Sequence, residues 1–221
     1  MMKNPAMREM ARKQQAAMQD LIYGNLYTAL RLSDEDKAQF KQLLADRASI
    51  DSDLGFQLMD STLSAAARQA AQDESKQQKE KSNADIRAFL DNEADYQAFE
   101  HYDQTKAERM TLTMNKGAFD AEPLTPEQET QLIDTMHAVA LRPSTTPDLS
   151  RPGTFDPSQF TQADLDRQLQ MLDRNSQAVR EAAGAFLSPG QQAILAQVQA
   201  SQRAMTAAGF EMMKSMGTGA K

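Results

Sequence analysis

Histidine is the side chain whose chemistry would be easiest to recognise here, as a metal ligand or as a general acid or base. The chain has two, His101 and His137, and no cysteine. Neither histidine occurs in the His-Glu-x-x-His spacing that places two ligands on one helix face. Glu100 and Tyr102 flank His101, but adjacent residues point to different faces of a helix. We therefore expect packed or half-exposed histidines and no metal site, with a metal-sensing helical domain as an alternative.

Carboxylates could also supply acid–base catalysis, but the close pairs in this chain coincide with predicted helix starts. Asp34 with Glu35, and Glu122 with Glu127, lie where the positive end of a helix dipole favours negative charge. The phosphate-binding patterns Gly-x-x-x-x-Gly-Lys and Gly-x-Gly-x-x-Gly do not occur. Without cysteine there is also no thiolate nucleophile. The sequence predicts a protein that is not an enzyme and needs no cofactor.

Methionine is the more informative excess, with 14 residues in a chain that has no tryptophan. The methionines concentrate in the ranges 1–18, 110–114 and 205–216. Their flexible thioether side chains can repack around different partners. We predict that a protein-binding surface includes Met7, Met10, Met18, Met205, Phe210, Met212 and Met213. The alternative is that methionine fills irregular gaps in a core.

The elements that must position these residues are helices. Hydrophobic residues make up 40% of the chain and aromatic residues 6%, and the β-branched residues that favour strands are scarce. We expect an all-α fold, an elongated bundle of antiparallel helical hairpins. The net charge of −7 argues against a general nucleic-acid binder, which needs a basic face. No apolar run is long enough to insert into a membrane, and Met1 to Met10 lack the apolar stretch of a signal peptide.

Four predicted helix starts share one pattern, an apolar residue followed by a capping residue. They are Leu32-Ser33, Leu90-Asp91, Leu124-Thr125 and Leu187-Ser188, and three of them have a polar residue at the third helical position, Asp36, Gln128 and Gln191. A further cap is expected at Ser82 with Asp85. The recurrence indicates an internal duplication: an N-terminal helix at 1–31, a first half at 32–117 and a second half at 118–221, with a proline-rich loop at 143–160, in one continuous domain. The alternative is that good caps converge on the same few residues.

The segments Leu124-Thr125-Pro126-Glu127-Gln128 and Leu187-Ser188-Pro189-Gly190-Gln191 resemble the paired Leu-Thr-x-x-Gln motifs of the Spy and CpxP family of periplasmic proteins. The resemblance implies an all-helical fold of long antiparallel hairpins, often a dimer, that acts as an ATP-independent chaperone or stress-sensor partner. The chain also resembles a group of exported bacterial proteins with the same order of features, beginning with Asn-Pro-x-Met-Arg-Glu-Met. Periplasmic or otherwise exported localisation follows from the resemblance, with a cytoplasmic location as the alternative.

These observations together favour an ATP-independent protein-binding or chaperone-like function. The partners expected are unfolded protein clients or one dedicated protein, held on an apolar helical surface, and a homodimer is compatible with the family resemblance. The motif residues would act structurally, as helix caps. A structural or envelope scaffold is the alternative from a different functional class.

Overall fold

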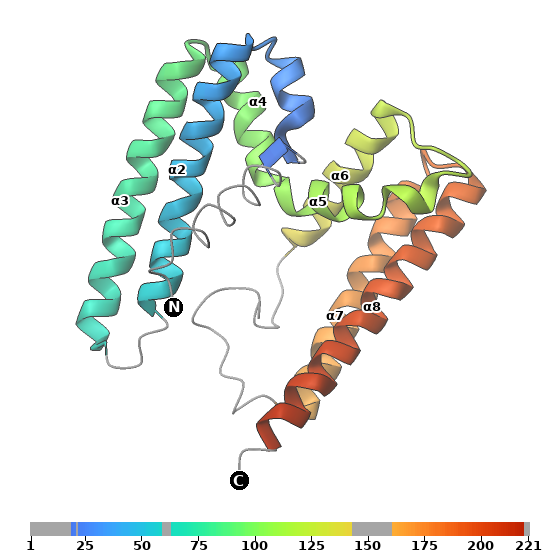
Figure 1. Cartoon of the computed structure of the whole chain (residues 1–221). Helices are drawn as coiled ribbons and strands as arrows, with labels where there is room; N and C mark the ends of the chain where they lie inside the picture. The colour runs from blue at the N-terminus through green and yellow to red at the C-terminus, as the bar shows by residue number, and fades with distance from the viewer. Residues whose placement is uncertain (1–18, 21, 59–62, 143–160, 219–221) are drawn as a thin grey trace. The chain divides into compact units, whose positions relative to one another are not determined.

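The computed structural model describes residues 19–20, 22–58, 63–142 and 161–218. Throughout these residues the regular secondary structure is helical, which confirms the predicted fold class (Figure 1). The chain divides into two compact units, Met1–Lys106 and Ala107–Lys221, called unit 1 and unit 2 below. Each unit has its own hydrophobic core. Met7, Met10, Met18 and the proline-rich segment 143–160 lie outside the described residues.

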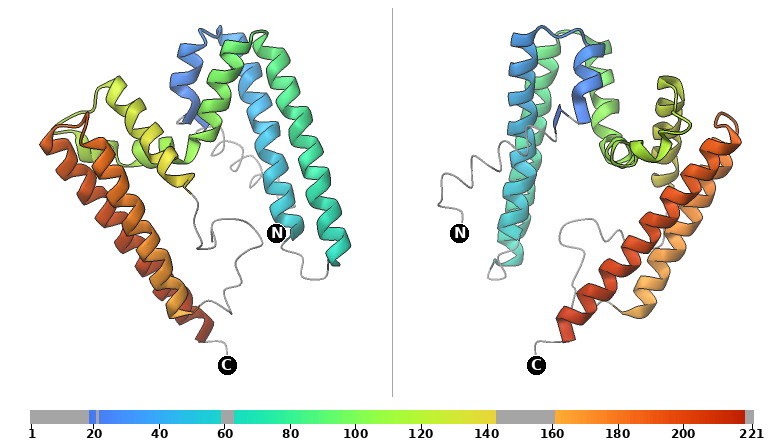
Figure 2. Two further views of the ribbon diagram at one scale, coloured as in Figure 1. Left: turned by 180° about the vertical axis from the view of Figure 1, so that it is seen from behind. Right: turned by 45° about the vertical axis from the view of Figure 1, so that its right-hand side comes forward.

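Unit 1 is built around a long helical hairpin. Helical residues 19–20 and 22–29 precede α2 (Asp34–Leu58), α3 (Ala65–Leu90) and α4 (Glu93–Gln104). The helices α2 and α3 lie side by side and antiparallel in every view (Figures 1 and 2). The side chain of Ser64 caps α3 by accepting a hydrogen bond from the N–H of Ala67. The cap predicted at Ser82 is wrong, because the strong helix formers around it continue α3 without a break.

Phe40 of α2 lies at the centre of the unit 1 core and is completely buried. The rings of Tyr27, Phe89 and Phe99 surround it, with centroids 6.0, 5.5 and 5.8 Å from its own. Two of these contacts are edge-to-face, the geometry that the charge distribution of aromatic rings favours. These four aromatic rings therefore meet where the helices of unit 1 converge.

A polar network crosses the same unit. Arg47 of α2 donates two hydrogen bonds of 2.8 Å to the Asp103 carboxylate on α4, and its Nε donates to Asn83 of α3. The hydroxyl of Tyr23 donates to the same carboxylate at 3.0 Å. Burial, together with the negative charge of Asp103, raises the pKa of Tyr23 above its ordinary range, so the hydroxyl remains a donor. The network fixes the register of the helices that contribute to it.

Unit 2 contains α5 (Lys106–Met114), whose first residue is the last of unit 1. It also contains the 3-10 turn η1 (Lys116–Phe119), α6 (Pro126–Ala140), α7 (Gln162–Ala183) and α8 (Pro189–Thr218). The helices α7 and α8 form a second antiparallel hairpin, and α6 packs against α7 (Figures 1 and 2). Hydrogen bonds from Thr161 lower the pKa of Asp164 to about 2, and the two residues form the capping box that starts α7. The core collects one buried group of side chains: Phe119, Leu132, Val139, Val179, Ala183, Leu187 and Leu195.

The unit boundary lies upstream of the one that the sequence repeat predicts. The division falls between Lys106 and Ala107 rather than at 117/118. Leu112 of α5 and Phe119 of η1 pack against the unit 2 core, which places these residues with the second half. The helical residues that precede α2 belong to unit 1, because Tyr23 and Leu26 are part of its core. The boundary between the units depends on which core each residue packs against, and the sequence repeat contains no information about that packing.

One predicted helix start is also placed differently. Ser33 caps α2, accepting a hydrogen bond from the N–H of Asp36 at 3.1 Å. Asp91, however, is the C-cap of α3 and adopts a left-handed conformation with φ of 52°. The cap of α4 is its neighbour Asn92, which is extended and accepts from the N–H of Asp95. The prediction of Asp91 as an N-cap after Leu90 is wrong, because one residue cannot be left-handed at a helix end and extended at a helix start.

Candidate functional site

The C-terminal part of α8 carries the two most exposed of the described residues predicted to bind protein. Met205 is 65% exposed and Met212 is 64% exposed. They are two turns apart, which places them on one face of the helix. Ala208 and Gly209 lie between them and are exposed as well. Nearer the start of α8, Leu195 and Val198 are buried in the unit 2 core or beside it. The apolar side chains of α8 therefore change from buried to exposed along the length of the helix.

The other predicted contact residues are placed less simply. Phe210 is half-buried on the same helix. Met213 belongs to α8, but its side chain is outside what the structure describes. Met7, Met10 and Met18, as stated above, precede the described residues. The structure thus brings Met205 and Met212 together on one face, which we call the α8 apolar face, with Ala208 and Gly209 as its other members.

Two further exposed apolar side chains were not among the predicted contacts. Met114 at the end of α5 is 75% exposed, and Leu141 after α6 is 70% exposed. The methionine cluster at 110–114 was a signal for the first of them. Leu141 follows the last residue of α6, and its residue type gave no signal that it would be exposed.

The two motif segments of unit 2 form matching capping boxes. Thr125 accepts a hydrogen bond from the N–H of Gln128, and the Gln128 side chain accepts one from the N–H of Thr125. Ser188 and Gln191 make the same pair of bonds at the start of α8. Each box satisfies two of the backbone donors that a helix start leaves without a partner. Leu124 and Leu187, which precede the boxes, pack against or belong to the unit 2 core.

The two boxes are joined by their glutamines. The amide nitrogen of Gln128 donates to the side-chain oxygen of Gln191 at 3.0 Å, and the reverse bond measures 3.1 Å. Gln128 also donates to the carbonyl of Phe186, and Gln191 to that of Pro123, so each glutamine binds the residue that precedes the other motif. We call this arrangement the glutamine pair. Through the glutamine pair, the start of α6 is hydrogen-bonded directly to the start of α8.

Glu122 precedes α6 in the sequence, but its carboxylate contacts the start of α8. The Ser188 hydroxyl donates to its carboxylate at 2.5 Å. A Cβ atom at Gly190 would lie 1.8 Å from Glu122 Oε1, so glycine at that position leaves room for the carboxylate. The negative charge therefore meets the positive end of the α8 dipole.

The histidines occur in different units and different surroundings. His101 is exposed on α4 of unit 1. His137 of α6 is half-buried, and its Nδ1 lies 3.3 Å from Glu108 Oε1 on α5. In the described part of the chain, no three histidine or acidic side chains come together as a set that could hold a metal ion. Of the helices that the structure describes, none has the length and apolar character needed to cross a membrane.

Comparison of the chain with models of known protein families, with curated proteins and with solved structures found no match. The function of the protein is therefore inferred from the exposure and contacts of its own side chains.

Proposed function

We propose that this protein is an ATP-independent, chaperone-like protein that holds apolar segments of other proteins on its helix surfaces. The observation that carries the proposal is the α8 apolar face, on which Met205 and Met212 are each about two-thirds exposed. Large apolar side chains grouped on the outside of a helix favour association with another apolar surface.

The composition of this face suits a variable partner. Methionine has three rotatable bonds in its side chain and a polarisable sulfur, so it can adapt to apolar groups of different shapes. Ala208 and Gly209 leave space between the two methionines, since a Cβ placed on Gly209 would have no atom within 4 Å apart from those of its chain neighbours and of the nearby helix backbone. A client side chain could approach the backbone of α8 at that point.

The charge of the chain supports the same function. A net charge of −7 keeps a protein with bound apolar segments in solution and favours basic or neutral clients over acidic ones. The resemblance to Spy and CpxP proteins adds the expectation of a periplasmic or exported location and of a homodimer, in which the two copies would present two such faces.

The test is an aggregation assay in the absence of nucleotide. We expect the protein, at stoichiometric amounts, to suppress light scattering by a denatured protein diluted into buffer. The double variant Met205→Gln with Met212→Gln should lose most of the suppression, because it makes the face polar while keeping the side-chain length.

Met114→Gln is the matched control, since Met114 is even more exposed, at 75%, but lies on α5. Its suppression should equal that of the unchanged protein. No suppression at severalfold excess would contradict the function, and equal suppression by the double variant would contradict the assignment to α8. An assembly that stays large on dilution and suppresses nothing would favour the scaffold alternative.

A further inference from the structure

Methionine supplies all the sulfur of this protein, because the chain has 14 methionines and no cysteine. Peroxides oxidise the thioether of methionine to a sulfoxide, which is polar where the thioether was apolar. Oxidation of sulfur in this protein therefore falls on methionine alone. Its consequences depend on which methionine side chains an oxidant in solution can reach.

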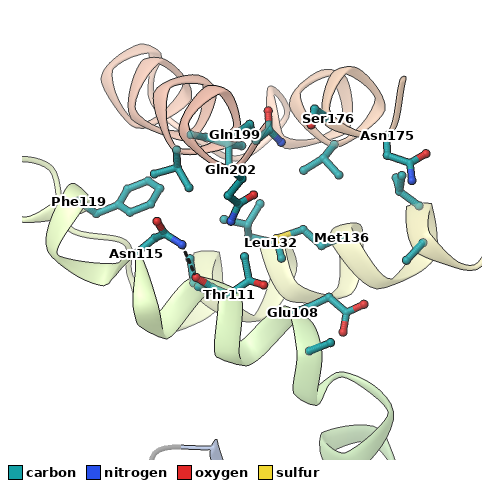
Figure 3. Close-up of a pocket in the computed structure, with 17 residues that line it drawn as sticks. Glu108, Thr111, Asn115, Phe119, Leu132, Met136, Asn175, Ser176, Gln199 and Gln202 are labelled. Atoms are coloured by element: carbon teal, nitrogen blue, oxygen red, sulfur yellow. Dashed lines mark hydrogen bonds between the residues drawn. The ribbon is translucent and has the colours of Figure 1, made fainter. Parts of the chain in front are cut away.

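The described methionines differ widely in exposure. Met114, Met205 and Met212 are 75%, 65% and 64% exposed. Met110 is half-buried on α5. Met136 packs against the unit 2 core, and Figure 3 shows it among the side chains of α5, α6, α7 and α8 that line a cavity of about 250 Å³. We therefore expect an oxidant to react with the three exposed methionines before the two that are partly buried.

Two of the three exposed methionines are the large side chains of the α8 apolar face. Ala208 and Gly209, its other members, contribute little apolar area. A sulfoxide oxygen on Met205 or Met212 is a strong hydrogen-bond acceptor that water satisfies in the free protein. An apolar client segment offers no donor to replace that water, and an acceptor buried without a partner is unfavourable. Oxidation therefore works against binding on this face.

We propose that oxidation of Met205 and Met212 to methionine sulfoxide is a reversible switch that turns off client binding on the α8 apolar face. The switch rests on the proposed function, because it regulates the same surface. Hydrogen peroxide is the oxidant: the sulfur lone pair attacks one peroxide oxygen, an S–O bond forms and the O–O bond breaks. The transferred oxygen gives its proton to the departing hydroxide, which becomes water. Sulfur loses two electrons and peroxide gains them.

The first test maps the modification without any client. The folded protein is treated with hydrogen peroxide, and the oxidation of each methionine is followed by proteolytic digestion and mass spectrometry. We expect the exposed Met114, Met205 and Met212 to be oxidised at least about threefold faster than Met110 and Met136. In urea the five rates should become similar, because unfolding removes the difference in exposure. Equal rates in the folded protein would overturn the proposed selectivity.

The second test measures the effect on aggregation. The oxidised protein, freed of peroxide before the client is added, should lose most of its suppression. Treatment with the two methionine sulfoxide reductases, one for each sulfoxide epimer, should restore it. The far-ultraviolet circular dichroism of the oxidised protein should stay unchanged. A loss of helical signal would assign the effect to unfolding and overturn the switch.

Two variants localise the effect. The double variant Met205→Leu with Met212→Leu keeps apolar side chains of similar volume, so it should suppress aggregation both before and after peroxide treatment. Met114→Leu is the matched control, because it removes an equally accessible sulfur from α5 instead of α8. It should lose suppression on oxidation just as the unchanged protein does.

The outcomes separate the switch from the function on which it rests. If the untreated protein suppresses aggregation and the oxidised protein does so equally well, the switch is overturned and the chaperone-like function stands. The switch is also overturned if the leucine double variant loses as much suppression on oxidation as the unchanged protein, since other methionines would then be responsible. If the untreated protein suppresses nothing, the proposed function fails, and the switch fails with it.

Discussion

The amide groups of Gln128 and Gln191 use their full hydrogen-bonding capacity. Each oxygen accepts two bonds and each nitrogen donates two. Gln191 is only 6% exposed, so water cannot replace a lost partner there. Removing one glutamine would leave buried polar groups unpaired in the other motif, and such groups cost about 1–3 kcal/mol each. At the scale of residues, the glutamine pair is where unit 2 should be most sensitive to substitution.

We therefore expect Gln191→Leu to lower the free energy of unfolding, measured by urea denaturation, by about 2 kcal/mol. Gln128→Leu removes the same shared bonds, so the double variant should cost less than the sum of the two. Gln131→Leu, an exposed position on α6, is the control and should change stability by less than about 0.5 kcal/mol. Additive effects of the two motif variants would contradict a mutual pair.

At the scale of elements, the Arg47–Asp103 contact connects α2 to α4. Burial alone would raise the pKa of Asp103, but the hydrogen bonds from Arg47 and the charge of Lys106 outweigh it, and the pKa lies below its ordinary value of 3.8. A carboxylate with a lowered pKa stabilises the folded state at any pH above its unfolded pKa. The stabilisation is lost as the pH falls through 3.8 and below.

The expected result is a difference in acid sensitivity between Asp103→Asn and the unchanged protein. At neutral pH the variant leaves Arg47 without its counter-ion and should be less stable by about 3 kcal/mol. Between pH 6 and pH 3, roughly, its free energy of unfolding in urea should fall less than that of the unchanged protein. Asp73→Asn, at an exposed site on α3, serves as the control. Equal losses in the protein and in Asp103→Asn would contradict a stabilising charge pair.

At the scale of the whole molecule, each unit has its own core, and all four tyrosines, at 23, 27, 96 and 102, belong to unit 1. Tyrosine signals therefore report on unit 1, whereas far-ultraviolet circular dichroism reports on the helices of both. We expect Phe40→Ala, which costs about 3–5 kcal/mol, to shift the melting transition seen by tyrosine fluorescence. Leu132→Ala, in the unit 2 core, should shift a transition seen by circular dichroism alone.

Phe40→Ala and Leu132→Ala serve as controls for each other, because each one changes the core of one unit and leaves the core of the other unit unchanged. Coincident shifts of both signals in both variants would show that the units unfold together and would contradict independent cores. The result also decides how the aggregation assay is interpreted, since a variant in one unit should leave the other folded.

The sites could be predicted only in part. Met205 and Met212 were predicted from residue type and are exposed, but Phe210 was predicted on the same grounds and is half-buried. Leu141 is exposed and was not among the predicted contacts. The spacing of apolar residues in the sequence predicts which side of a helix is apolar. Whether another helix covers that side depends on where the neighbouring helices end in the fold.

The sequence by itself determined the helical class and three of the helix starts, at Ser33, Thr125 and Ser188, because a cap is a contact between residues three positions apart. Even at that range Asp91 and Asn92 could exchange roles, since both residue types suit a helix start and a left-handed helix end. Only the tertiary structure decided that the caps at Thr125 and Ser188 meet through a glutamine pair. That contact joins residues far apart along the chain, and it forms only because the helices of unit 2 pack around a common core.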